Sequence, residues 1–202
     1  MLHIKSINRK GNVIYMLKDT DNEKLENSSG IKDIIKLIIL GFLGYLCGMF
    51  LVTFVIGIGN VPTNSMSPTI IGNDKLLISP IPFYFRNPER FEVVTFQSGD
   101  MTLVKRVIGM PNDVIDLVDG QVFINGEALN ESAYLSSNIQ TYEIEGSSIR
   151  FPYVVPEESY FMLGDNRGNS SDSRLYGAVA RDAIRGDVLI RIFPFNRIGK
   201  VE

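Results

Sequence analysis

Apolar residues follow two different patterns along this chain of 202 residues. The run from Leu37 to Ile58 holds 22 residues without a charge, whereas from Val61 onward apolar residues come in short segments separated by turn formers. A helix of 22 residues is about 33 Å long, enough to cross the hydrocarbon core of a bilayer. We expect a membrane span at 37–58, a preceding segment at 1–36 and a separate domain at 59–202.

Two other structures pass the same hydropathy test. A helix buried in a protein core should show a polar face, and this run offers only Tyr45 and Thr53. A removable signal peptide has a shorter apolar stretch of about 7 to 15 residues and a small-residue cleavage site. Here the preceding segment is 36 residues long and no A-x-A-like site follows. The pattern therefore favours a retained membrane span.

Basic residues on the two sides of the span predict its orientation. The first twenty positions after the span contain only Lys75. The segment before the span carries seven, namely Lys5, Arg9, Lys10, Lys18, Lys24, Lys32 and Lys36. Because cytoplasmic flanks of membrane helices are enriched in Lys and Arg, we expect a cytoplasmic N-terminus and an extracytoplasmic C-terminal domain, in a single-pass protein of the cell membrane.

The region after the span has the pattern of a mainly β, antiparallel domain. Its segments are rich in β-branched and aromatic residues, and Asp119-Gly120 and Asn125-Gly126 are typical of tight hairpin turns. The predicted strands are 75–79, 91–96, 102–109, 114–118, 121–124, 141–144, 149–155, 160–163 and 187–193. Residues 1–30 are polar, and apart from a strand-like patch at 12–17 we expect little stable structure there.

Composition excludes several classes of protein. A net charge of −3 and a pI near 5.3 give no electrostatic case for binding nucleic acid. The single cysteine, Cys47, lies in the apolar run, and the single histidine, His3, lies before it. The C-terminal domain therefore has no disulfide and no His or Cys to ligate a metal, and it shows no cluster of carboxylates. We expect no metal and no cofactor.

One serine stands in a rigid setting just after the apolar run. Ser65 lies in V-P-T-N-S-M-S-P-T, where Pro62 and Pro68 restrict the backbone to extended and turn conformations. A hydroxyl becomes a nucleophile when a neighbouring group takes its proton, and histidine is the usual partner. His3 is separated from Ser65 by the whole span. If Ser65 is catalytic, the best placed base is Lys105.

Lys105 sits beside Arg106 in the predicted strand T-L-V-K-R-V-I-G. Alternate strand residues point to opposite faces, so one of the two can face solvent while the other lies in an apolar environment with Leu103 and Val107. Lysine can act as a base only if burial lowers its pKa. On this strand alone, two ordinary surface cations are the alternative interpretation.

A third stretch, L-G-D-N-R-G-N-S-S-D-S-R, follows a predicted strand and is dense in hydrogen-bonding side chains. It indicates an ordered polar loop whose hydroxyls could orient a lysine and in which Asp172 and Arg174 could form an ion pair. A solvated turn or an oxygen-ligand cation loop are alternatives. The EF-hand pattern does not fit, because a serine stands where that pattern requires glycine.

Together these segments resemble the bacterial type I signal peptidases, membrane-anchored Ser-Lys proteases that remove signal peptides from exported proteins. The resemblance runs from the span to the C-terminus and rests on residues 65–69, 105–113 and 164–174, with P-F-N-R-I-G at 194–199 in support. It implies signal peptides as substrates, cleavage after small residues in A-x-A-like sites, no cofactor, and the lipid bilayer and the secretion translocon as partners.

The resemblance also assigns roles to individual residues. It implies that Ser65 is the nucleophile, that Lys105 is the general base and protonates the leaving amine, and that the Thr63 hydroxyl and the Ser65 N–H form the oxyanion hole. Ser170 would aim Lys105 by a hydrogen bond, and the loop would be supported by Asp165, Asp172 and Arg174. The pockets for substrate residues one and three places before the cleaved bond would be lined by Val61, Pro62, Met66, Ile70, Leu103 and Val104.

The chain departs from the family pattern at two positions. Gly168 replaces a usual aspartate, and Asn112 replaces the glycine of G-x-P-G-D, which puts the conformation of those loops in doubt. Lys105, in place of histidine, groups the chain with the bacterial or organellar members. Two other functions remain open: a tethered β-domain that binds an exported partner without cutting it, and a self-cleaving Ser-Lys repressor, against which the span argues.

One aromatic cluster, I-P-F-Y-F at 81–85, lies close in sequence to the Ser65 loop. Either it packs in the domain core, or part of it rests in the lipid interface, where Tyr and Phe are favoured. Under the second hypothesis, changing Phe83 and Phe85 to serine weakens binding to lipid vesicles.

Overall fold

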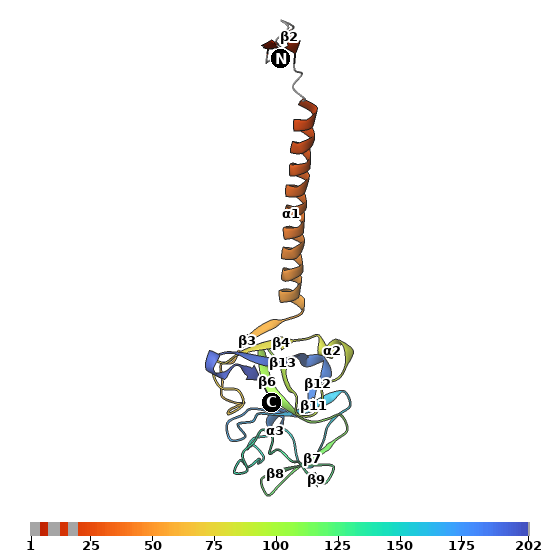
Figure 1. The fold of residues 1–202 in the computed structure, drawn as a ribbon. Helices are drawn as coiled ribbons and strands as arrows, with labels where there is room; N and C mark the ends of the chain where they lie inside the picture. Colours follow the sequence, from red (N-terminus) through yellow and green to blue (C-terminus); the bar gives the residue numbers. More distant parts are fainter. Residues whose placement is uncertain (1–4, 8–12, 16–19, 202) are drawn as a thin grey trace. The chain divides into compact units, whose positions relative to one another are not determined.

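The computed structural model describes residues 5–7, 13–15 and 20–201, with side chains described at 30–51 and 55–201. The chain divides into two compact units, with the boundary between Phe50 and Leu51 (Figure 1). In the first unit, β1 (Lys5–Ile7) pairs antiparallel with β2 (Val13–Tyr15). These strands and the helix that follows contradict our expectation of little structure in this segment, whereas β2 agrees with the strand-like patch; the rest of that patch lies outside the described residues.

The long helix α1 (Thr20–Phe54) contains most of the expected span, residues 37–54. Its segment Gly30–Leu51 has a mean hydropathy of 2.3 and exposed side chains, so it is long and apolar enough to cross a membrane. The helix starts well before the predicted span and stops four residues short of Ile58. It stops there because the chain then forms a strand, β3 (Gly57–Asn60), which pairs with β4.

The second unit is built from two antiparallel sheets, which confirms the predicted mainly β fold. The large sheet has the spatial order β12 (Val179–Ala180), β11 (Ser159–Leu163), β6 (Met101–Gly109), β5 (Val93–Ser98), β13 (Ile184–Phe193), β4 (Lys75–Ser79) and β3, with β14 (Gly199–Lys200) also on β13. The small sheet has the order β10 (Tyr153–Val154), β7 (Val114–Val118), β8 (Gln121–Ile124) and β9 (Glu127–Ala128). The short helices are α2 (Pro82–Phe85), α3 (Ser173–Tyr176), η1 (Arg181–Ala183) and η2 (Phe195–Arg197).

Both predicted hairpin turns are present in the small sheet. Asp119 and Gly120 have φ values of 49° and 78°, and Asn125 and Gly126 have 54° and 85°. Two consecutive residues with positive φ match the right-handed twist of the flanking strands, which explains the choice of Asp-Gly and Asn-Gly. The predicted strand at 141–144 is wrong, since that segment is irregular.

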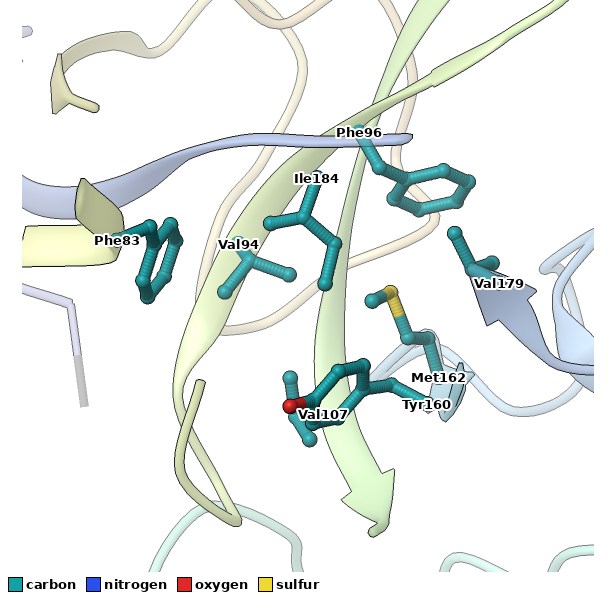
Figure 2. Close-up of a cluster of buried hydrophobic side chains, with 8 residues drawn as sticks. All are labelled: Phe83, Val94, Phe96, Val107, Tyr160, Met162, Val179 and Ile184. Carbon is teal, nitrogen blue, oxygen red and sulfur yellow. The ribbon is translucent and has the colours of Figure 1, made fainter. Parts of the chain in front are cut away.

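Three clusters of buried apolar side chains hold the sheets together. One lies on one face of the large sheet and contains Phe83, Val94, Phe96, Val107 and Met162, as Figure 2 shows. Side chains from β5, β6, β11 and β13 meet in this cluster, and Phe83 joins them from α2. A second cluster lies between the two sheets, and a third lies under the Ser65 loop. The strand β6 contributes to all three environments, so its register determines where each of its side chains points.

Candidate active site

The Ser65 loop is a turn-rich segment tied down by backbone hydrogen bonds. The Val61 N–H donates to Asp74 O at 3.0 Å, the Asn73 N–H donates to Val61 O at 2.8 Å, and the Ile70 N–H donates to Met66 O at 2.9 Å. Met66 and Ile70 are buried in the cluster beneath the loop. The hydroxyl of Ser65 is therefore presented by a fixed loop and not by a helix, as its two prolines predict.

Lys105 reaches Ser65 from the middle of β6. Its Nζ lies 2.7 Å from Ser65 Oγ, although the two residues are 40 positions apart. On the strand, Lys105 lies on the same face as Leu103 and Val107. Val107 belongs to the cluster of Figure 2 and Leu103 packs against it, and only 2% of the surface of Lys105 is exposed. Burial lowers the pKa of Lys105, and the carboxylates of Asp172 and Asp165 partly oppose that change. The site thus brings an alcohol together with an amine that loses its proton more readily than a free lysine.

The neighbouring Arg106 is also buried, so the expectation that one of the two cations faces solvent is wrong. Its guanidinium makes two parallel hydrogen bonds to Asp165, Nε to Oδ1 at 3.0 Å and Nη2 to Oδ2 at 2.8 Å. The guanidinium also stacks on the ring of Tyr134, 4.1 Å from its centroid. Thr69 donates its hydroxyl to the same carboxylate at 2.6 Å. Asp165 therefore links β6, the Ser65 loop and the third loop, by which we mean residues 163–174.

The predicted ion pair within the third loop is present. Arg174 donates to Asp172 from Nε and Nη2, both at 2.9 Å, and both side chains are buried. Asp172 also caps α3 by accepting from the Arg174 N–H, and it accepts from the Gly164 N–H at 3.0 Å. The loop is thus an ordered element of the core and not a solvated turn.

Ser170 lies beside the reacting groups, but its predicted hydrogen bond to Lys105 is not formed in this structure. Its hydroxyl is buried and has no hydrogen-bond partner among the described residues. A Cβ atom added to Gly164 would collide with both Ser170 Oγ and Ser65 O. Glycine at this position is therefore what lets the third loop approach the Ser65 loop so closely.

Two hollows open next to Ser65 and share Asn60, Val61, Thr102 and Val104 in their walls. The first, of about 270 Å³, is also lined by Pro62, Thr63, Ser65, Met66, Met101, Leu103 and Lys105. The second, of about 350 Å³, is also lined by Gly57, Ile58, Gly59, Leu76, Ile78 and Thr95.

These walls contain five of the six residues predicted to bind substrate. The exception is Ile70, which is fully buried in the cluster beneath the loop and lines neither hollow. The prediction for Ile70 is therefore corrected: its apolar side chain supports the loop from below. Asn60, Met101 and Thr102 were missed because β3 and the start of β6 meet only in the folded chain.

Two hydrogen-bond donors in the first hollow are free. Within residues 55–201, nothing accepts a hydrogen bond from the Ser65 N–H or from the Thr63 hydroxyl. Thr63 is exposed and lines the first hollow together with Ser65. Both donors can therefore serve a ligand oxygen, as the assignment of an oxyanion hole requires.

Comparison with known proteins identifies the family of this chain. Residues 31–193 match the family described as signal peptidase, peptidase S26. The chain is 36% identical over 155 residues to a probable signal peptidase I-2 of Synechocystis, covering 73% of this chain and 67% of that relative. A signal peptidase I structure from Enterococcus faecalis is 32% identical, with a TM-score of 0.43 and coverage of 51% of this chain and 97% of that one.

Another relative carries a different description. It is named inactive signal peptidase IA of Staphylococcus aureus, and it is 24% identical over 167 residues, covering 83% of this chain and 96% of that relative. Activity in an individual chain thus has to be argued from its own reacting groups.

The match to the family covers most of the sequence, including the span, the Ser65 loop, β6 and the third loop. This chain belongs to the signal peptidase family, peptidase S26.

Proposed function

We propose that this chain cleaves signal peptides from exported preproteins with Ser65 as nucleophile and Lys105 as general base. The observation that carries the proposal is the 2.7 Å separation of Ser65 Oγ and a buried Lys105 Nζ. Residues 55–201, to which Ser65 and Lys105 belong, contain no histidine. Lys105 is therefore the group in position to take the serine proton.

The reaction needs one amine in two protonation states. Neutral Lys105 accepts the proton of the Ser65 hydroxyl while Oγ forms a bond to the scissile carbonyl carbon. The resulting ammonium then gives that proton to the leaving amine as the peptide C–N bond breaks. In the second half, Lys105 takes a proton from water while the water oxygen forms a bond to the acyl carbon. The proton then passes to Ser65 Oγ as the bond between the acyl carbon and Oγ breaks.

The negative charge of the tetrahedral intermediate falls where the free donors lie. The Ser65 N–H and the Thr63 hydroxyl both have no partner among residues 55–201. Donors aimed at a developing oxyanion contribute about 3 to 4 kcal/mol each to lowering the barrier. We therefore assign Thr63 and Ser65 to the oxyanion hole, while Asp165, Asp172 and Arg174 hold the loops that frame it.

The two adjoining hollows support cleavage after small residues. In an extended peptide, side chains two positions apart point the same way and lie about 6.6 to 6.8 Å apart along the chain. A peptide whose scissile carbonyl lies at Ser65 can place the side chain before the cleaved bond in the first hollow. The side chain two positions further back then reaches the second hollow. The shared wall formed by Val61 and Val104 suits alanine at both sites.

The membrane placement follows from α1 and the charges that precede it. Members of this family are membrane-anchored, and Gly30–Leu51 is the candidate anchor. We propose the division into a cytoplasmic segment at 1–36, a span at 37–58 that the structure shortens at its C-terminal end, and an extracytoplasmic catalytic domain from 59 onward. In this arrangement the domain meets preproteins as they leave the secretion translocon. Protease added outside spheroplasts should degrade the domain and spare an N-terminal tag.

The decisive experiment compares the purified full-length chain with its Ser65→Ala and Ser67→Ala variants on a peptide that carries an A-x-A site. Mass spectrometry should show cleavage after the second alanine by the wild type and by Ser67→Ala, but not by Ser65→Ala. Ser67 is the matched control, since it lies two residues away and its hydroxyl makes no hydrogen bond among residues 55–201. Binding without cleavage by the wild type would instead support the non-catalytic β-domain.

A further inference from the structure

Asn166, in the third loop, makes two hydrogen bonds to the backbone on either side of the nucleophile. Its backbone N–H donates to Ser65 O at 3.0 Å, and its side-chain Nδ2 donates to Asn64 O at 3.0 Å. The two segments are about a hundred residues apart in the chain. Because a carbonyl oxygen only accepts, the side-chain bond depends on the amide nitrogen of Asn166.

The two acceptors belong to the two peptide units that flank the Ser65 Cα. A peptide unit is planar, so Asn64 C=O and Ser65 N–H point in opposite directions and turn together. A donor that holds Asn64 O therefore also determines where the Ser65 N–H points. Hydrogen bonds in a chain also polarise one another, so a bonded Asn64 carbonyl makes the Ser65 N–H a stronger donor.

We propose that Asn166 is a positioning residue that aims the Ser65 N–H at the oxyanion of the tetrahedral intermediate. The inference rests on the proposed function, because the N–H acts on an oxyanion only if Ser65 is the nucleophile. Asn166 touches neither Lys105 Nζ nor Ser65 Oγ by any hydrogen bond of the described residues. Its contribution is thus to the transition state and not to the basicity of the lysine or to substrate binding.

The size of the effect is bounded by what else holds the same oxygen. The Ser67 N–H also donates to Asn64 O, at 3.1 Å, so the peptide unit is not released entirely when the side chain of Asn166 is lost. Removing an oxyanion donor outright lowers kcat by about 10²- to 10³-fold. We expect a smaller loss, of about 10- to 100-fold, for a donor that remains but is less well aimed.

The test measures kcat and KM of the full-length chain in detergent micelles on an A-x-A peptide over a range of pH. Asn166→Ala should lower kcat by about 10- to 100-fold, keep KM within about 3-fold of wild type, and leave the pH dependence of kcat unchanged. Asn169→Ala is the matched control, because Asn169 is an exposed asparagine of the same loop whose side chain makes no hydrogen bond among residues 55–201. It should behave as wild type.

Two further measurements separate positioning from damage to the fold. Asn166→Asp keeps the shape of the side chain but cannot donate when ionised, so it should lose kcat even if the alanine variant is poorly folded. In a Ser65→Ala background, adding Asn166→Ala should leave the dissociation constant of a labelled substrate peptide unchanged. Weaker peptide binding there, or a shifted pH profile of Asn166→Ala, would overturn the proposal.

The outcomes also distinguish this inference from the proposed function. Wild-type kcat in both Asn166→Ala and Asn166→Asp, in an enzyme that cleaves and requires Ser65, overturns the positioning role alone. Absence of cleavage by the wild-type chain overturns the proposed function and the inference with it.

Discussion

Burial and two carboxylates act in opposite directions on the amine of Lys105. Because burial prevails, its pKa lies below 10.5 and the neutral amine becomes available at a lower pH than in free lysine. We predict that the cleavage rate rises with pH as Lys105 loses its proton and then levels off. Lys105→Arg should be inactive across the range, because guanidinium stays protonated. A pH–rate profile of both proteins checks this, and an active arginine variant would contradict the role of Lys105 as base.

Burial of Lys105 also lowers the stability of the folded protein. Between the lowered pKa of the folded state and the ordinary pKa of the unfolded state, the unfolded chain binds more protons, so stability rises with pH across that window. At pH values below this window Lys105 is charged in both states, and burial of the charged amine then lowers the stability of the folded state by the full amount. Lys105→Met should therefore melt at a higher temperature than wild type at neutral pH, and the difference should shrink as pH rises toward 10.5. Lys200→Met, at an exposed lysine, should show neither effect.

Single residues were predictable from sequence where local chemistry identified them. The stiff loop around Ser65, between Pro62 and Pro68, is such a case, whereas the strand of Lys105 by itself left an ordinary surface cation as an alternative. Arg106 as the partner of Asp165, and Asn166 as a partner of the Ser65 loop, were not predictable. Their hydrogen bonds join segments 59 and about 100 residues apart, and only the pairing of β6 with β11 brings these segments together.

At the scale of elements, the turn after β6 explains one departure from the family pattern. Asn112 has a φ of 70°, in the left-handed region that glycine adopts without strain and asparagine adopts more readily than other side chains. We predict that Asn112→Gly changes stability by only a few tenths of a kcal/mol, whereas Asn112→Val destabilises by about 1 to 2 kcal/mol. Urea unfolding of the three proteins measures this. Equal midpoints for the valine and glycine variants would show that the turn is not strained.

Strands with strict local patterns were predicted to the residue, as β4, β7 and β8 show. β3 was missed because its residues continue the apolar run of the helix, and only its pairing with β4 reveals it as a strand. The wrong strand at 141–144 has the opposite cause. The Thr141 N–H donates to Gly120 O, Arg174 donates to Tyr142 O, and Ile144 O accepts from the Ser147 N–H in a local turn. These single bonds form no ladder with any strand of the described residues.

At the scale of the whole molecule, the aromatic cluster at 81–85 is divided between the core and the surface. Phe83 is buried in the core of Figure 2, and the guanidinium groups of Arg86 and Arg181 both lie over its ring. Tyr84 and Phe85 are 72% and 87% exposed. A substitution of Phe83 therefore tests stability and not lipid contact, which corrects the choice of variant made from sequence.

The exposed pair makes the lipid hypothesis testable. The chain from Gly57 onward lies within one compact unit, and circular dichroism can confirm its fold without the span. We predict that changing Tyr84 and Phe85 to serine weakens its binding to phospholipid vesicles by about 100-fold, because each of the two aromatic rings loses apolar burial of about 1.5 kcal/mol. Tyr142→Ser, at an exposed tyrosine outside α2, is the control. Undiminished vesicle binding by the double variant would exclude α2 as a lipid contact.

The pairing of β5 with β6 carries a consequence for how such an enzyme can fail. Val94 lies opposite Lys105 and Val93 opposite Arg106, so two cations of different chemistry sit one step apart on the same strand. A shift of β6 by one residue that moves Arg106 into the place of Lys105 would present the permanently charged guanidinium to the serine and move the amine of Lys105 into the apolar place of Val104. Deleting one residue near the start of β6 should thus leave a domain that folds but does not cleave peptides. For this chain, catalytic competence is a property of strand alignment as much as of side-chain identity.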